Sequence, residues 1–304
     1  MITLQATRMM DTVCLLFVLV FSSHASGAVY TRDSDGNTID FSHRFSRIIS
    51  LYAAHTENLV TMGLNQEIIA VSRADNNLKS RPKLGYRDDA ERFLALDPDL
   101  VLIRPMISRA HPRLVSRLRQ SGVKVVSLQP VTIREMFDYW RTLGKLTGRE
   151  QEAEEMVQEF KRQQAIMDRK VGNIAPQQRK RVYFESIHRR MKTFAPTSMA
   201  IFVLTAAGGI NIASDTVQLR NTNIAEYGKE RILAKADQID VFLAQKGRMN
   251  PIRIEDIFSE PGFQVIKAVR EGRVYLIDEK RVSRPTMGLL EGIRRIYSLL
   301  YEPS

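Results

Sequence analysis

Short apolar runs alternate with helical patterns along most of the chain. Residues 48–51 and 68–71 are apolar except for Ser50 and rich in β-branched side chains, which predicts buried strands. Between them we expect Thr56 to cap a short helix over 56–64 that ends near Gly63. A second unit repeats this order, with an expected strand, a helix stop and a further strand at 100–103, Gly122 and 123–128. Strands and helices that alternate at these lengths indicate parallel sheets covered by helices.

The middle of the chain predicts two consecutive helices. Thr132 and Glu135 form a capping box, and apolar residues recur at helical spacing from there to Leu143. An apolar stripe then runs through 149–170 without Gly or Pro, which predicts a helix about 30 Å long. Strands are expected again at 181–185, 241–244 and 274–277. We therefore predict an α/β fold of two Rossmann-like lobes with central parallel sheets, joined by one long rigid helix.

These patterns divide the chain into a signal peptide, an N-terminal α/β lobe, a connecting helix and a C-terminal α/β lobe, at 1–28, 29–148, 149–172 and 173–304. A short internal repeat supports two lobes of common architecture. Residues 91–95 (ERFLA) precede one expected strand as residues 230–234 (ERILA) precede another. An Asp-rich turn follows each copy, and then strand, helix, Gly and strand follow in the same order.

The first residues of the chain predict export. An apolar run of nine residues, 13–21, follows a positively charged start and precedes the small residues 26–28. Nine residues are too few for a membrane-spanning helix, which needs about 20, so we expect cleavage after Ala28 or Ala25. Cys14 lies inside the apolar run and not at its end, which disfavours a lipid anchor. The expected product is a soluble periplasmic protein that does not span the membrane.

Composition narrows the class of function. The 304 residues include 45 Lys and Arg against 34 Asp and Glu, a net charge of +11, which suits an anionic partner or a generally basic surface. Because Cys14 is the only cysteine, an intrachain disulfide, a cysteine-based zinc cluster and an iron–sulfur site are excluded. The basic residues are not interleaved with aromatic ones, so we expect no nucleic-acid partner.

Five segments together resemble the periplasmic substrate-binding proteins of ABC importers for cobalamin, ferric siderophores and haem, the class III or metal-chelate type. The segments are 47–51, 96–101, 118–126, 140–148 and 207–211, and the resemblance covers roughly 47–301. It implies a monomer that captures a metal chelate in a cleft between the lobes, without catalysis or a cofactor. It also implies delivery of that chelate to an ABC permease dimer with its ATPase.

The resemblance gives the internal repeat a second meaning. In the family, one surface glutamate per lobe meets arginines of the two permease subunits, and Glu91 and Glu230 match those positions. Two carboxylates at matching places on two similar lobes suit a dimeric partner. The alternative is that each glutamate only favours a helix N-terminus through the helix dipole.

Candidate ligand residues follow from the strand pattern. Ligands of parallel α/β sheets bind beyond the carboxyl ends of the strands, and basic or hydrogen-bonding residues recur in the loops expected there. Guanidinium groups bind carboxylate or catecholate oxygens through paired hydrogen bonds, so these loops suit an anionic chelate. The candidates are Tyr52, His55, Arg104, His188, Arg190, Lys192 and Arg284. The alternative for each of them is a solvated position on the surface.

Two other functions remain open at this stage. A binding protein for free zinc or manganese would use His55, His111 and His188 with a carboxylate, although the surrounding cations would repel a free dication. An exported enzyme would use His55 with Glu57, or His188 with Glu185, as an acid–base pair. No Gly-x-Ser-x-Gly or phosphate-loop motif accompanies these pairs.

Overall fold

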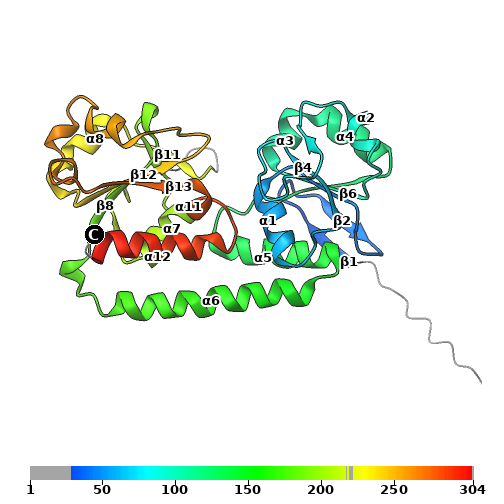
Figure 1. Cartoon of the computed structure of the whole chain (residues 1–304), viewed down its shortest axis with the longest axis horizontal. Coiled ribbons are helices and arrows are strands. Elements are labelled where there is room, and N and C mark those ends of the chain that lie inside the picture. The colour runs from blue at the N-terminus through cyan, green and yellow to red at the C-terminus, as the bar shows by residue number, and fades with distance from the viewer. Residues whose placement is uncertain (1–28, 217, 219–221, 303–304) are drawn as a thin grey trace, which may run out of the picture.

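The computed structural model describes residues 29–216, 218 and 222–302. They form two α/β lobes, and the long helix α6 (Glu150–Gly172) runs along the lower edge of both in Figure 1. Residues 1–28, with Cys14 and the expected signal peptide, lie outside the described part of the chain. Within the described ranges, no helix is both long enough and apolar enough to span a membrane. The two-lobed α/β fold is confirmed.

The N-terminal lobe is built on a parallel sheet of strand order β5-β4-β3-β6-β7. Its strands are β3 (Ile48–Ser50), β4 (Ile68–Ser72), β5 (Lys83–Leu84), β6 (Leu100–Ile103) and β7 (Lys124–Ser127). Its helices are α1 (Ala53–Thr61), α2 (Ala90–Leu94), α3 (Pro105–Ala110), α4 (Pro112–Gln120) and α5 (Ile133–Thr147). A hairpin of β1 (Val29–Arg32) and β2 (Thr38–Phe41) precedes the sheet.

Helix α1 begins earlier than its sequence pattern predicts. Its first residue is Ala53, so Thr56 lies inside the helix, where its hydroxyl donates to Ser50 Oγ at 2.8 Å and caps nothing. The expected stop is confirmed, because Gly63 follows the helix with a left-handed φ of +86°. The capping residue of α5 is also as predicted, since Thr132 Oγ1 accepts from the Glu135 backbone N–H at 3.2 Å.

The C-terminal lobe has a mixed sheet of order β11-β9-β8-β12-β13, with β10 also paired to β8. Its strands are β8 (Arg181–Ile187), β9 (Lys192–Phe194), β10 (Ile210–Asn211), β11 (Ile224–Glu226), β12 (Val241–Lys246) and β13 (Val274–Asp278). Its helices are α7 (Met199–Ala206), α8 (Lys229–Ala234), α9 (Ile254–Phe258), α10 (Lys267–Arg270), α11 (Glu279–Val282) and α12 (Gly288–Tyr301).

The antiparallel part of this sheet departs from the predicted parallel arrangement. Strands β8, β12 and β13 are parallel, but β9 runs antiparallel to both β8 and β11. The connection from β8 to β9 is a short turn in which Met191 adopts a left-handed φ of +47°. A turn this short can join only antiparallel neighbours, because a parallel crossover needs a dozen or more residues.

The internal repeat forms corresponding helices in the two lobes. Residues 91–95 include most of α2 and precede β6, and residues 230–234 belong to α8 and precede β12. The third residue of each copy, Phe93 or Ile232, is fully buried under its sheet. The first residue of each copy, a glutamate, is exposed. Burial of the third residue explains why the two lobes share this pattern.

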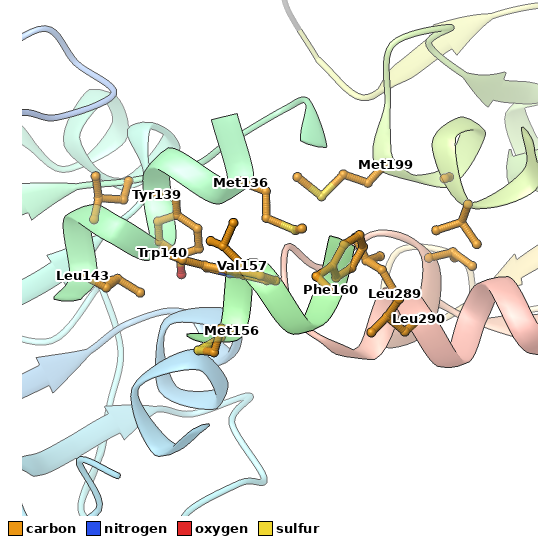
Figure 2. Packing of buried hydrophobic residues seen from close by; sticks show 14 of the residues in the cluster. Met136, Tyr139, Trp140, Leu143, Met156, Val157, Phe160, Met199, Leu289 and Leu290 are labelled. Carbon is orange, nitrogen blue, oxygen red and sulfur yellow. The ribbon is translucent and has the colours of Figure 1, made fainter. Parts of the chain in front are cut away.

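The largest apolar cluster extends from one lobe into the other. Residues of α5 and α6 pack in it against residues of α7 and α12 (Figure 2). The fully buried rings of Trp140 and Phe160 meet edge to face at 5.8 Å between centroids, and Phe160 lies 6.3 Å from Phe202. Figure 2 also shows Leu289 and Leu290 of α12 beside Phe160. Helix α6 is therefore packed into the core of the molecule.

Candidate functional site

Two adjacent strands of the N-terminal lobe place a tyrosine and an arginine together. Strands β3 and β6 pair in parallel, and Tyr52 and Arg104 follow their carboxyl ends. The Arg104 guanidinium carbon lies 4.4 Å from the centroid of the Tyr52 ring, in a cation–π contact. Among the described residues, the buried Arg104 Nε has no hydrogen-bond partner and no carboxylate pairs with the guanidinium. The positive charge of Arg104 at the strand ends is therefore available to an anionic ligand.

The C-terminal lobe contributes Arg284, which follows α11. Its Nη2 lies 3.4 Å from Glu279 Oε1, and both side chains are mostly buried. Burial raises the pKa of Tyr52, while the charges of Arg104 and Arg284 lower it and those of Glu279 and Glu57 raise it. Thr286, two residues after Arg284, donates its hydroxyl to Glu57 Oε1 of α1 at 3.0 Å, so Arg284 lies at the junction between the lobes.

A glycine brings two strand ends of the C-terminal lobe together at this junction. Gly247, after β12, lies so close to the Glu279 carboxylate that an added Cβ would be 2.0 Å from Oε2. The neighbouring Arg248 N–H donates to the same oxygen at 3.1 Å. Glu279 is therefore fixed by the backbone after β12 as well as by Arg284.

His55 is not presented to a ligand, which corrects its place among the candidates. Its side chain is fully buried, its Nδ1 lies 2.7 Å from Tyr139 Oη, and its Nε2 lies 3.1 Å from the Ile103 carbonyl. Burial lowers the pKa of His55 to about 3, so the ring is neutral at physiological pH. Its ring also meets Tyr52 edge to face at 5.1 Å, so His55 supports Tyr52 from behind.

His188 is held in an ionic network of its own lobe. Its Nδ1 lies 2.9 Å from Oε2 of the fully buried Glu185, and its Nε2 lies 3.6 Å from Glu260 Oε2. Burial alone lowers the pKa of His188, but the hydrogen bond and charge of Glu185, with the charges of Glu260 and Asp256, raise it above its ordinary value. This pair is close enough for proton transfer, but Glu185 has no exposure through which a substrate could reach it.

The remaining basic candidates lie where β8 connects to β9, Arg190 in the turn and Lys192 as the first residue of β9. Arg190 is exposed and Lys192 is half-buried, with its ammonium group paired to Glu226 of β11. No hydrogen bond or ion pair joins either of them to Tyr52 or Arg104 in the part of the chain that the structure describes. The structure therefore brings together Tyr52, Arg104 and Arg284 from the predicted set.

The two glutamates of the repeat are exposed on their respective lobes. Glu91 lies in the first turn of α2 and pairs with Arg117 of α4 at 3.0 Å. Glu230 lies in the first turn of α8, and no ion pair involves it within the described ranges. Both positions also favour the helix N-terminus, so the dipole interpretation and the docking interpretation remain compatible with the geometry.

The three histidines of the metal-ion alternative do not form a site. His55 is buried, His188 is engaged with carboxylates, and His111 lies against the Tyr86 ring at 5.0 Å between centroids. In residues 29–216, 218 and 222–302, no group of three or more His, Cys, Asp or Glu side chains is arranged to hold a metal ion.

Two hollows of the surface lie away from Tyr52, Arg104 and Arg284. A cavity of about 700 Å³ is lined by residues of α6, β13 and α12, and one of about 300 Å³ by residues around Tyr86 and His111. Neither is lined by a candidate chelate-binding residue, although His111 of the metal-ion alternative lines the smaller one. In the larger one, Arg281 is already paired with Glu291 at 2.8 Å and Arg294 donates to Gln163 at 2.8 Å. We therefore take the unpaired guanidinium of Arg104 at the strand ends, and not the size of a hollow, as the indicator of the candidate site.

Comparison with known proteins decides the family. A sequence profile described as periplasmic binding protein matches residues 48–281, which is most of the chain. The chain belongs to this periplasmic binding protein family. It is 22% identical over 278 residues to an uncharacterized ABC transporter substrate-binding lipoprotein of Bacillus subtilis, covering 88% of this chain and 84% of that protein.

Two further comparisons agree with this membership. The vitamin B12-binding protein of Salmonella choleraesuis is 24% identical over 208 residues, which cover 67% of this chain and 74% of that protein. The crystal structure of a possible iron-binding (periplasmic solute-binding) protein from Staphylococcus epidermidis superimposes with a TM-score of 0.73 at 25% identity. That match covers 85% of this chain and all of the other. Membership in a family of ABC substrate-binding proteins implies delivery of a ligand to a permease.

The acidic residues that act on Tyr52 in this periplasmic binding protein were not among the chelate-binding candidates from the sequence. The charges of Glu279 and Glu57 both raise the pKa of Tyr52, and Glu57 was considered only as the partner of His55 in an enzyme. A search of strand-end loops for cations passes over both. Glu279 directly follows the last residue of β13, so the strand-end rule applied to acidic residues identifies it.

Proposed function

We propose that this protein captures an anionic metal chelate, a ferric siderophore, corrinoid or haem, between its lobes and delivers it to an ABC permease dimer with its ATPase. The observation that carries the proposal is the Arg104 guanidinium, stacked on Tyr52 and without a carboxylate partner among the described residues. Relatives described as binding vitamin B12 and iron support the class of ligand.

Tyr52, Arg104 and Arg284 form the proposed core of the site. Arg190, in the turn after β8, and Lys192, at the start of β9, remain proposed contacts, and Lys192 would reach the ligand after it releases Glu226. We assign His55 and His188 no direct contact, because their ring nitrogens are occupied. The site needs no cofactor and no catalytic residue.

The same proposal includes the compartment, the oligomeric state and the domain limits of the protein. We infer a periplasmic monomer, released by cleavage of residues 1–28, with no nucleic-acid partner and no enzymatic activity. We also retain 29–148, 149–172 and 173–304 as its N-terminal lobe, connecting helix and C-terminal lobe. Helix α6, which begins at Glu150 and ends at Gly172, supports those limits.

Removing either guanidinium should weaken ligand binding strongly. A charge-assisted hydrogen bond contributes about 1.5–3 kcal/mol, so Arg104→Ala and Arg284→Ala should each lower affinity roughly 10- to 150-fold. Calorimetric titration with a ferric hydroxamate, cyanocobalamin and haem measures the effect and identifies the chelate. The matched control is Arg169→Ala, an exposed arginine of α6. Affinity within twofold of wild type in both site variants contradicts the proposed site.

Removing the repeat glutamates should impair delivery without affecting capture. Glu91→Ala with Glu230→Ala is expected to leave chelate affinity unchanged and to slow uptake into cells severalfold, since charge complementarity governs docking rate and orientation. Uptake of the labelled chelate measures the effect, and Glu155→Ala, an exposed glutamate of α6, is the control. Loss of chelate binding in a folded double variant would place these glutamates in the ligand site.

A further inference from the structure

The loop between α11 and α12 connects the two lobes through its backbone. The carbonyl of Pro285, in the C-terminal lobe, accepts from Asn58 Nδ2 of α1 at 2.9 Å and from Trp140 Nε1 of α5 at 3.0 Å. The next residue, Thr286, donates its hydroxyl to Glu57 Oε1 of α1 at 3.0 Å. Figure 1 shows this loop on the side of the C-terminal lobe that faces α1.

These contacts are withdrawn from solvent. Asn58, Trp140 and Thr286 are each fully buried. Both donors approach one carbonyl, and proline has no N–H of its own to satisfy. A buried carbonyl that loses its donors is left without hydrogen bonds, so the folded state strongly favours the docked loop.

The donors are themselves held rigidly. Asn58 Nδ2 also donates to Tyr139 Oη at 3.2 Å, and Tyr139 lies 2.7 Å from His55 Nδ1. His55 Nε2 lies 3.1 Å from the Ile103 carbonyl, at the end of β6. Neutral His55 therefore accepts from Tyr139 and donates to Ile103. The chain of hydrogen bonds runs from the residue before Arg104 to the residue after Arg284.

We propose that the docked loop is a second, noncovalent connection between the lobes, with Asn58 and Trp140 as positioning residues for Arg284. Helix α6 and the apolar cluster of α5, α6, α7 and α12 join the lobes along one edge, and apolar packing has little directional preference of its own. The docked loop adds directional hydrogen bonds, which further restrain rotation of the lobes in the absence of ligand. It also fixes the position of Arg284, whose charge acts on Tyr52. This last effect rests on the proposed function, whereas the restraint on the lobes does not.

Interlobe distances in the ligand-free protein test the restraint. The background is the full chain carrying Cys14→Ser, with one spin label in each lobe. The labels are attached at the exposed positions Gln120→Cys of α4 and Glu255→Cys of α9. We expect one narrow distance distribution for this background and a clearly broadened one when Asn58→Ala and Trp140→Phe remove both donors.

A matched variant separates loss of this connection from loss of stability. Ser186→Ala removes a buried hydrogen bond, 2.8 Å from Ser186 Oγ to the Thr193 carbonyl, entirely within the C-terminal lobe, and should leave the distribution narrow. If the double variant does not fold, Trp140→Phe alone should broaden the distribution, because it keeps an aromatic ring and removes one donor. A folded donor variant whose distribution superimposes on the background overturns the proposal.

Affinity then tests the positioning of Arg284. For whichever of ferric hydroxamate, cyanocobalamin and haem binds, the donor variants should lose about tenfold in affinity and add little to Arg284→Ala, since they act through that residue. Additive losses overturn the positioning role and leave the restraint intact. If none of the three probes binds, the proposed function fails, while the distance measurement still decides the connection between the lobes.

Discussion

Phe160→Ala is expected to lower the free energy of unfolding by about 3–5 kcal/mol. Phe160 is fully buried in α6 and contacts the rings of Trp140 and Phe202, so its removal leaves a cavity between helices of both lobes. Urea unfolding followed by circular dichroism measures the change. Phe137→Ala, at a half-buried position whose ring lies beside those of Trp140 and Phe160, should cost clearly less.

The same experiment tests whether the lobes unfold together. Because the cluster around Phe160 belongs to both lobes, we expect the fluorescence of Trp140 and the circular dichroism of the whole chain to change in one transition. Two separate transitions in the wild type, or a cost below about 1 kcal/mol for Phe160→Ala, would show that α6 is not part of a shared core.

His188→Ala should destabilise the protein by about 3–5 kcal/mol near pH 6, because it leaves the carboxylate of Glu185 buried and unpaired. Adding Glu185→Gln removes that charge and should recover most of the loss, since a neutral amide does not need a cationic partner. Urea unfolding of the three variants measures the cycle. If Glu185→Gln recovers nothing, the loss comes from packing and not from charge.

The pH dependence of this pair follows from the direction of its shifts. The folded-state pKa of His188 is raised, so its contribution to stability is fully present below the unfolded value of about 6.5. That contribution is lost as pH rises through the higher folded-state pKa. Burial also raises the pKa of Glu185, which acts in the same direction. The free energy of unfolding of wild type, relative to that of the double variant, should therefore fall from pH 6 to pH 9.

The elements that the sequence predicted well are those fixed by local chemistry. The strand at 100–103 was predicted with its observed limits because every residue in it is buried and apolar. The long helix was predicted to within a few residues because its stripe contains no Gly or Pro. The start of α1 was missed because Tyr52 makes no side-chain cap there, so no polar residue marks the boundary.

The site was less predictable than the fold. Strand-end positions were enough to find Tyr52 and Arg104, but whether a side chain faces the junction depends on packing across the lobes. His55 lies three residues from Tyr52, yet its ring turns into the protein to meet Tyr139, which is 84 positions away. The hydrogen bonds to Pro285 span 145 and 227 positions, and no local pattern indicates them.

The position of α12 has a consequence for the order in which the molecule acquires its structure. Leu289 and Ile293 of this helix complete the cluster that starts with Trp140 in α5. A growing chain with both sheets synthesised but without residues 288–301 would leave those buried rings of α5 and α6 exposed to water. Neither lobe can therefore reach its final packing during synthesis of the first 287 residues, and the chain stays incompletely packed until α12 is made.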